Sequence, residues 1–308
     1  MTDSKVLIVG TMAFDEVETP TGSSGKTIAG SATYIALATS FFDVESAIVS
    51  IVGRDFPQDY LKKLSNRNIN LEGVEINKSG DTFYWKGRYH KNLNRRDTLV
   101  TDLNTLANFN PIVPDNFKDA EVALLGNLHP RIQMSVLDQI NPNKTTIILD
   151  TMNYWIEGNW DELVQVVAKT DVITINDEEA LQMTNATNVL SAAKKISNMG
   201  PSYVIIKKGE HGALLYHKEQ IFLAPAVVLD NVVDPTGAGD SFAGGLAGFL
   251  ASQPKLDFET MKTAMVYGSS VASFCVTDFG TKSILNTTLL QIMERVEDLK
   301  TLVRFEVN

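Results

Sequence analysis

A stretch of small residues near the carboxyl end of the chain, residues 233–245, holds the groups best suited to chemistry. Gly237, Ala238 and Gly239 carry almost no side chain, so their backbone N–H groups can approach a ligand closely. The apolar residues that follow at helical spacing place these amides at a helix N-terminus, which binds anions and phosphate above all. Asp240 lies at the same point and could cap the helix, or it could remove a proton from a hydroxyl that attacks phosphorus.

Alternating strands and helices must position this stretch. Continuous apolar runs predict buried strands over 6–9, 47–52, 122–125, 146–149, 172–175 and 204–206, and a hairpin over 213–216 and 221–223. Helical spacing predicts helices over 32–42, 57–66, 132–140, 163–167, 178–183, 189–199, 241–251, 258–276 and 289–299. Such alternation indicates an α/β fold with a mostly parallel sheet that helices cover on both faces. Asp150, Asn176 and the turn 207–209 each follow a strand, so we expect them to share the carboxyl edge of the sheet, where ligands bind.

The segment 71–103 has a different character. It is aromatic around Trp85, prone to β structure, interrupted by glycine, and without a helical pattern. We expect a small β element that stands off the main sheet as a lid, a dimer surface or both. The whole chain, 1–308, is expected to form one domain with a β-rich lid built from about residues 12–30 and 71–103.

Composition narrows the classes of function. A net charge of −10 argues against a nucleic-acid partner, because backbone phosphates demand a basic surface. The single cysteine, Cys275, fits a reducing compartment, and no stretch approaches the roughly 20 apolar residues of a membrane span. The N-terminus leads directly into the first strand, too soon for a signal peptide. We therefore expect a cytoplasmic protein without a membrane partner.

Three other motifs do not fit their patterns. The segment 20–27 resembles a P-loop, but Pro20 stands where the first glycine is required, and the acidic run 14–18 before it does not have a strand pattern. We expect a polar surface turn there. A dinucleotide fingerprint is also excluded, because Gly10 is one glycine where three are needed, and the four histidines lack metal-ligand spacing.

Residues 234–242 resemble the C-terminal signature of the ribokinase-like (PfkB-type) carbohydrate kinase family. The resemblance covers nearly the whole chain and includes Asp15, Gly30, 52–55, 176–179, 208–212 and Gly280. It implies a ribokinase-like fold and an ATP- and Mg²⁺-dependent kinase that phosphorylates a hydroxyl of a sugar or sugar-like small molecule. Two alternatives are a nucleoside kinase of the same family and a non-catalytic sugar-binding or regulatory protein.

By this resemblance, Asp240 is the general base, and Gly237, Ala238, Gly239 and the Asp240 amide form an anion hole for the transferring phosphoryl group. Asn176 and Glu179 match the magnesium-and-phosphate motif of the family, in which Glu179 acts on Mg²⁺ through water. The same two residues could instead form a helix capping box.

The resemblance also assigns the rest of the nucleotide site. Its members are Asn176, Lys208, Gly209, Gly212, Thr236, Ser269, Ala272 and Gly280. The 208–212 turn would follow the phosphates, although it could be a plain hairpin turn, and the helix residues would wall the adenine pocket unless they only pack helices. Asp234 matches a position near which family members bind a monovalent cation such as K⁺, or it caps the turn.

The acceptor site would contain Asp15, Gly30, Ser31, Asn153 and Arg96. Asp15 matches the carboxylate that accepts hydrogen bonds from sugar hydroxyls. Arg96 could contact a negatively charged acceptor or remain a solvated loop charge. Tyr34 replaces the usual asparagine, which is a departure from a ribose-type contact set. The aromatic residues around Trp85 could stack on a nucleobase or pack the lid itself, and the lid could pair two copies in a homodimer.

Overall fold

A computed structural model describes residues 4–93, 95–304 and 306, so the ends and Asn94 of the expected 1–308 domain lie outside the described residues. The main sheet runs in the spatial order β14 (Gln220–Ala224), β13 (Ala213–His217), β12 (Tyr203–Lys207), β11 (Val172–Asn176), β10 (Thr146–Asp150), β9 (Val122–Leu125), β1 (Lys5–Val9), β4 (Glu45–Gly53) and β5 (Ile69–Asn70), and β6 (Val74–Asn77) also pairs with β4. Only the hairpin of β13 and β14 makes antiparallel pairs among the described strands of this sheet. The expected α/β architecture is confirmed.

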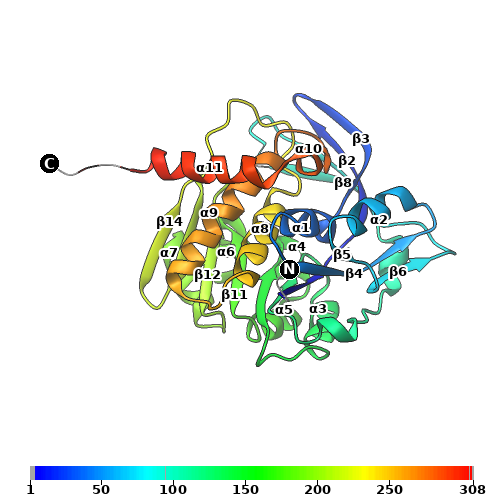
Figure 1. Cartoon of the computed structure of the whole chain (residues 1–308), viewed down its shortest axis with the longest axis horizontal. Coiled ribbons are helices and arrows are strands. Elements are labelled where there is room, and N and C mark those ends of the chain that lie inside the picture. Colours follow the sequence, from blue (N-terminus) through cyan, green and yellow to red (C-terminus); the bar gives the residue numbers. More distant parts are fainter. Residues whose placement is uncertain (1–3, 94, 305, 307–308) are drawn as a thin grey trace.

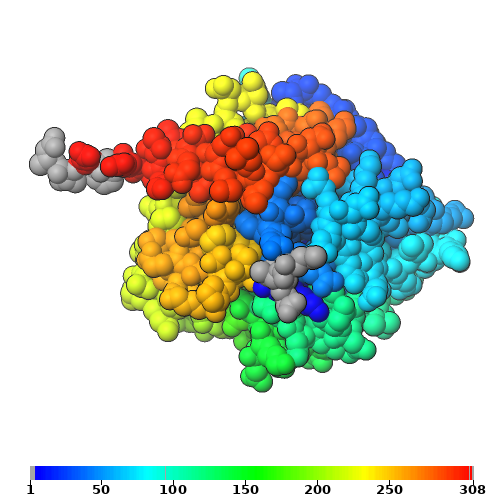
Figure 2. Space-filling view, viewed as in Figure 1, coloured from blue at the N-terminus to red at the C-terminus, as the bar shows by residue number. Residues whose placement is uncertain are grey.

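Helices cover both faces of the sheet (Figure 1). One face carries α1 (Ser31–Thr39), α2 (Gln58–Ser65), α8 (Ala238–Ala251), α9 (Phe258–Cys275), α10 (Lys282–Asn286) and α11 (Leu289–Leu302). The other carries α3 (Pro130–Leu137), α4 (Asn153–Gly158), α5 (Trp160–Val167), α6 (Asp177–Thr184) and α7 (Val189–Ser197). Short 3₁₀ turns are η1 (Asn104–Asn108), η2 (Asp115–Phe117) and η3 (Gly209–His211). In the space-filling view α11 (red) lies on the surface and packs next to α9 (orange) (Figure 2).

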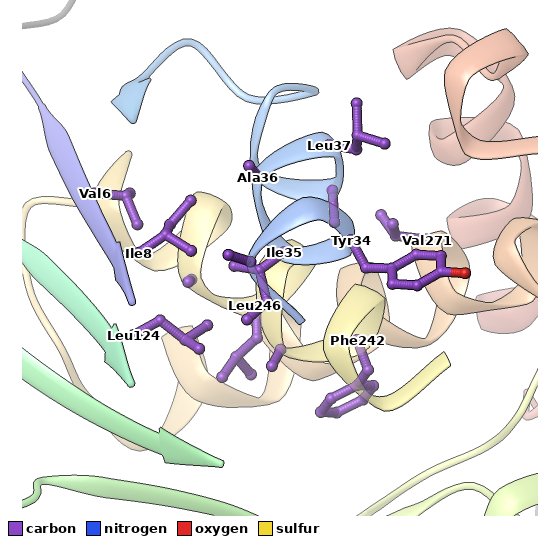
Figure 3. Packing of buried hydrophobic residues seen from close by; sticks show 14 of the residues in the cluster. Val6, Ile8, Tyr34, Ile35, Ala36, Leu37, Leu124, Phe242, Leu246 and Val271 are labelled. Atoms are coloured by element: carbon purple, nitrogen blue, oxygen red, sulfur yellow. The ribbon is translucent and has the colours of Figure 1, made fainter. Parts of the chain in front are cut away.

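Each buried strand serves two cores because its side chains alternate between the faces. In β1, Ile8 faces the cluster under α1 and α8, whereas Leu7 faces the cluster under α3 to α7. Figure 3 shows Ile35 of α1 and Leu246 of α8 pointing toward Ile8 and the strands. This two-sided burial explains why the strands are continuous apolar runs in the sequence. No helix among the described residues is both long and apolar enough to cross a membrane.

A second sheet, in the order β3-β2-β7-β8, stands beside the main one. It contains β2 (Ala13–Thr19) and β3 (Gly22–Ala29) from the N-terminal part, and β7 (Tyr84–Tyr89) and β8 (Arg96–Asp102) from the aromatic segment. We call it the lid sheet. Residues 74–77, which we had placed with the lid segment, instead extend the main sheet as β6, because they pair in parallel with the end of β4.

The prediction that residues 14–18 are not a strand is wrong. The acidic side chains of β2 find cations on the neighbouring strand: Glu16 binds Lys86 Nζ at 2.7 Å, and Glu18 binds Arg88 Nε at 2.7 Å. Cross-strand ion pairs of this kind stabilise a strand that has no apolar pattern. The segment 20–27 is likewise more than a polar turn, because β3 begins at Gly22.

Three differences concern helices. The helix expected over 241–251 begins at Ala238, so Asp240 lies inside its first turn. The helix expected over 132–140 is shifted and spans Pro130–Leu137, with Pro130 at its first position, where a missing amide proton costs nothing. The short helices α4 and α10 were not expected, since each is too short to show helical spacing in the sequence.

Candidate active site

The segment that leads into α8, together with the first residues of that helix, spans residues 234–240, and we call it the α8 loop. Its shape depends on Gly237. This residue caps the helix with φ 78°, a left-handed conformation that favours glycine. A Cβ at this position would lie 2.5 Å from Cζ of Tyr34, whose ring packs against the loop. Tyr34 extends from α1 in Figure 3 and is buried, with no hydrogen-bond partner for its hydroxyl among the described residues. The backbone therefore has room to present its amides only because residue 237 has no side chain.

Asp240 stands in the first turn of α8, three residues after Gly237. Burial, and then the nearby charge of Asp150, raise the pKa of Asp240 to about 7, although Lys207 and Arg96 act in the opposite direction. A carboxylate with a pKa near neutrality holds or releases a proton with little free-energy cost at physiological pH. Asp240 is therefore suited to general-base chemistry.

The carboxyl edge of the main sheet supplies a charged group of its own. Lys207, the last residue of β12, donates to Asp150 Oδ1 at 2.9 Å, and the Thr174 hydroxyl donates to the same oxygen at 3.1 Å. Asn176 at the end of β11 pairs in register with Lys207. The expectation that 150, 176 and the 207–209 turn share one edge is thus what the geometry shows.

Asn176 and Glu179 form a capping box at the start of α6. The Glu179 amide donates to Asn176 Oδ1 at 2.7 Å, and the Asn176 amide donates to Glu179 Oε2 at 3.1 Å. Burial raises the pKa of Glu179 to about 7, Lys207 lowers it and Asp150 raises it. The capping interpretation therefore holds, and the same carboxylate also lies in the electrostatic field of the site.

Asp15 reaches the site from the lid sheet. Its side chain is buried, and burial together with the charges of Asp234 and Asp240 raises the pKa of Asp15 to about 8, while Arg96 lowers it. Asp15 and Trp85 are partners in the parallel pairing of β2 and β7, so both side chains start from the face of the lid that looks toward Asp240.

Two further residues connect the lid to the α8 loop. The Thr236 hydroxyl donates to the Tyr89 hydroxyl at 3.2 Å, across the space between the loop and β7. Arg96, the first residue of β8, acts electrostatically on Asp15, Asp240 and Glu179, and its guanidinium carbon lies 5.8 Å from the centre of the Trp85 ring. Arg96 is thus an exposed residue at the edge of the lid whose charge acts on the carboxylates of the site.

A profile described as pfkB family carbohydrate kinase matches residues 4–288. The chain belongs to this family. PfkB-family kinases are phosphotransferases that act on hydroxyl groups, and the protein is accordingly an ATP-dependent kinase of a small hydroxyl-bearing acceptor, a sugar or a nucleoside.

Curated relatives in the PfkB family act on different acceptors. The chain is 28% identical to the cytidine kinase of Thermococcus kodakarensis over 253 residues, which are 81% of this chain and 90% of that one. It is 24% identical to a nucleoside kinase of Methanocaldococcus jannaschii, over 89% of this chain and 87% of the relative. It is 25% identical to an ATP-dependent 6-phosphofructokinase of Thermoanaerobacterium thermosaccharolyticum, over 96% and 95%.

Solved structures of the PfkB family show the same fold. The M. jannaschii nucleoside kinase superposes with a TM-score of 0.78 at 20% identity, covering 96% of this chain and 98% of that one. Ribokinase from Giardia lamblia gives 0.81 at 17% identity, with 96% and 99% covered. A putative ribokinase II of E. coli in complex with ATP and Mg²⁺ gives 0.79 at 19% identity, also with 96% and 99% covered.

The turn assigned to the nucleotide phosphates is built for a close approach of backbone. Gly209 and Gly212 have φ 54° and 78°, and the Lys208 amide donates to the Gly212 carbonyl at 2.7 Å. Ser269 and Ala272 lie on α9, the first buried and the second half-buried, where small residues also allow α9 to pack against α8. Their roles toward a nucleotide stay predictions.

Gly280 contacts the lid sheet rather than standing free. It has φ 62°, and a Cβ there would lie 2.6 Å from the Thr27 hydroxyl of β3. The segment expected to wall the adenine pocket therefore also supports the lid. Thr236, which is also predicted in the nucleotide site, contacts the lid as well, because its hydroxyl donates to the Tyr89 hydroxyl.

The remaining acceptor-site predictions differ in their surroundings. Gly30 has φ 97°, and a Cβ would lie 2.4 Å from the Thr11 carbonyl oxygen. The Ser31 hydroxyl accepts the Thr11 amide at 3.0 Å and is buried, so its side chain joins α1 to the end of β1. Asn153 begins α4 and is exposed. The charges of Asp15 and Arg96 thus act together with that of Asp240, and the roles of all five residues toward an acceptor stay predictions.

Two site residues were not anticipated from the sequence, Lys207 and Tyr89. The signal for Lys207 was its place as the last strand residue in register with Asn176, whereas we assigned the phosphate role to its neighbour Lys208. The signal for Tyr89 was its spacing in β7. Trp85, Gly87 and Tyr89 are each two residues apart, so they lie on the same face of the strand.

Proposed function

We propose that the protein transfers the γ-phosphoryl group of ATP to a hydroxyl of a nucleoside, with Asp240 as general base. The observation that carries the proposal is the placement of two carboxylates whose charges act on each other, the buried Asp15 of the lid and Asp240 in the first turn of α8. Asp15 would hold acceptor hydroxyls, and Asp240 would take the proton of the attacking one. The new bond joins that oxygen to the γ-phosphorus, and the bond from phosphorus to the leaving oxygen of ADP breaks.

The α8 loop would supply the charge stabilisation. Gly237, Ala238, Gly239 and the Asp240 amide stand at the positive end of a helix of 14 residues, and fixed amides cost no reorganisation during the reaction. Thr236, the 208–212 turn and α9 would hold the rest of the nucleotide.

The donor set fits a magnesium ion that accompanies the nucleotide. Glu179 and Asn176 present oxygen atoms next to Asp150, and oxygen is what Mg²⁺ prefers. No group of three or more His, Cys, Asp or Glu side chains in the described part of the chain has metal-binding geometry by itself. When bound, the ion neutralises charge on the phosphates, and Glu179 would hold it through water.

A monovalent cation would suit Asp234. One of its carboxylate oxygens accepts the Thr236 amide at 2.9 Å, and the other is buried with no hydrogen-bond partner among the described residues. An unpaired buried carboxylate oxygen is costly, and a cation such as K⁺ would remove that cost. We propose this site as a support for the α8 loop.

A nucleoside acceptor is favoured over a simple sugar by Trp85. Its ring lies against Gly87, where a Cβ would be only 2.1 Å from the indole, and its partner in the sheet is Asp15. A half-buried aromatic plane beside a hydroxyl-binding carboxylate matches a base joined to a ribose. Both aromatic residues also bind within the lid, since the Trp85 indole N–H donates to the Thr98 hydroxyl at 3.3 Å and the Tyr84 hydroxyl donates to Glu16 at 3.0 Å.

We further propose that residues 1–308 work as one domain whose lid sheet covers the acceptor. The Thr236–Tyr89 hydrogen bond is the contact that would hold this lid over the α8 loop. The edge strands β3 and β8, with Leu99 of β8 exposed, offer a surface for a homodimer. Light scattering at working concentration tests the dimer, and a monomer contradicts it.

An acceptor panel tests the proposed function. ADP formation is measured with cytidine, inosine, ribose and fructose 6-phosphate, and thermal shifts report binding in parallel. We expect a nucleoside to exceed ribose in kcat/KM by about tenfold or more, since base stacking is worth roughly 1–3 kcal/mol. A clear preference for ribose or the sugar phosphate contradicts the nucleoside proposal. Binding without ADP formation for every acceptor favours a non-catalytic role.

A further inference from the structure

Lys207 differs from the other lysines that pair with carboxylates. Its side chain and that of Asp150 are 17% and 9% exposed, whereas in the Lys144–Asp119 pair the exposures are 60% and 54%. The Lys207 ammonium lies 2.9 Å from Asp150 Oδ1 at the carboxyl edge of the sheet. A buried ion pair is costly to desolvate and contributes little to stability. The Lys207–Asp150 pair is therefore a candidate for a functional role.

The Lys207 ammonium also borders the α8 loop. A Cβ on Gly239 would lie 3.0 Å from Nζ and 3.8 Å from Cε of Lys207. The ammonium therefore lies beside the first turn of α8, to which the amides that begin this helix belong. An anion that accepts hydrogen bonds from those amides would also meet the positive charge of Lys207.

We propose that Lys207 is a catalytic residue that contacts the transferring phosphoryl group, and that Asp150 is a positioning residue that holds its ammonium. The proposal rests on the proposed phosphoryl transfer at the α8 loop. An ammonium has three donors, and Asp150 takes one of them. The remaining donors can follow the phosphoryl oxygens, on which negative charge is spread in the transition state.

The local charge balance supports a role beyond neutralising Asp150. Asp150, Glu179 and Asp240 all act electrostatically on Lys207, so three carboxylates surround one buried ammonium. Asp150 already accepts a second hydrogen bond, from the Thr174 hydroxyl. A polyanionic nucleotide entering such an acidic site needs fixed positive charge next to the phosphorus that reacts, and Lys207 is the buried cation that touches the α8 loop.

Four variants test this role. Lys207→Met removes the charge with little change in length, Lys207→Arg keeps it, and the double variant Lys207→Met/Asp150→Asn removes both charges of the pair. Lys144→Met is the matched control, because it breaks an exposed ion pair remote from the α8 loop. We measure kcat with the best acceptor, and the affinity for MgADP by calorimetry with and without aluminium fluoride, a mimic of the phosphoryl group in transfer.

For Lys207→Met we expect kcat to fall by about 10²–10³-fold, the range found when one stabilising donor is removed from a transition state. MgADP affinity should change by less than about threefold, while the tightening by aluminium fluoride is lost, because only the transition state gains from this contact. Lys207→Arg should retain part of the wild-type kcat and part of the tightening by aluminium fluoride. Lys144→Met should resemble the wild type.

The double variant separates the two roles. If Lys207 only neutralises Asp150, removing both charges restores kcat and the aluminium fluoride effect, and the proposal is overturned. If Lys207 contacts the phosphoryl group, the double variant stays as slow as Lys207→Met. It also keeps the test open should the single variant not fold, since it removes both partners of the Lys207–Asp150 ion pair together. If no acceptor supports turnover in the wild type, the proposed function fails, and the aluminium fluoride measurement still decides the role of Lys207.

Discussion

The hydroxyl of Thr236 donates to the hydroxyl of Tyr89 at 3.2 Å, and this bond joins the α8 loop to the lid sheet. Thr236 lies one residue before Gly237, and Tyr89 ends the strand that also carries Trp85. The position of the lid and the position of the anion-binding amides are therefore coupled through one pair of side chains.

Replacing Tyr89 with phenylalanine should weaken this connection. The Thr236 hydroxyl loses its acceptor, and a lost hydrogen bond of about 1 kcal/mol corresponds to roughly a fivefold loss in kcat/KM. Tyr84→Phe is the control, because it removes a tyrosine hydroxyl that binds Glu16 within the lid. Steady-state kinetics in which both variants lose activity equally would show that the Tyr89 contact has no special role.

Trp85→Ala should raise KM for a nucleoside by about tenfold or more, because the base loses a stacking partner. KM for ATP and for a simple sugar should stay nearly unchanged. Trp160→Ala is a suitable control, since Trp160 is a partly exposed residue at the start of α5, on the helices that cover the other face of the sheet. An equal rise in KM for sugar and nucleoside would argue that Trp85 supports the lid rather than a base.

Asp15→Asn should stabilise the protein above neutral pH. The pKa of Asp15 is about 8 in the folded chain because of burial and then the charges of Asp234 and Asp240, against a reference value of 3.8. Stability from this group is fully present below pH 3.8 and is lost as the pH rises through about 8, since the folded chain then carries a buried charge. We expect thermal denaturation to show a gain of several degrees at pH 8.5 and a much smaller one at pH 4.

Asp55→Asn should behave in the opposite way. Burial raises the pKa of Asp55, but hydrogen bonds from the Thr82 hydroxyl and amide outweigh it and leave the pKa below 3.8. Its stabilisation is present above pH 3.8 and is lost as the pH falls through the lowered pKa. The substitution should therefore lower the melting temperature at neutral pH. Melting curves with the same sign for both variants at pH 8.5 would contradict the buried-charge account of Asp15.

Proton removal by Asp240 predicts an acidic limb in the pH dependence of kcat/KM. Burial and the charge of Asp150 place the pKa of Asp240 at about 7 in the free protein, and only the deprotonated form can act as base. Activity should fall tenfold per pH unit well below that value. A flat profile between pH 5.5 and 7.5, with folding intact by circular dichroism, would rule out this assignment.

The main sheet could be predicted from the sequence because its strands are buried on both faces and are therefore continuous apolar runs. The strand β2 could not, since its acidic residues are matched by cations of β7, which lie about 70 positions away in the chain. Short helices such as α4 could not be predicted either, because a helix of six residues has too few turns to show the helical spacing of apolar residues.

The chemistry could be predicted where it is local in sequence. Gly237 to Asp240 are consecutive, so a helix N-terminus with a carboxylate is visible in the chain itself. Lys207 was missed because its importance comes from Asp150, 57 positions earlier, and from Gly239 on a different element. The hydrogen bonds between the Ser31 hydroxyl and Thr11 are likewise not visible in the sequence, because the two residues are 20 positions apart, and the acceptor role of Ser31 stays a prediction.

The most direct test of the central claim is Asp240→Asn, assayed with the best acceptor while MgATP binding is followed by calorimetry. The account predicts that kcat falls by about 10³-fold or more, because the attacking hydroxyl loses its base, while MgATP still binds. Turnover within a few-fold of the wild type would show that Asp240 is not the general base.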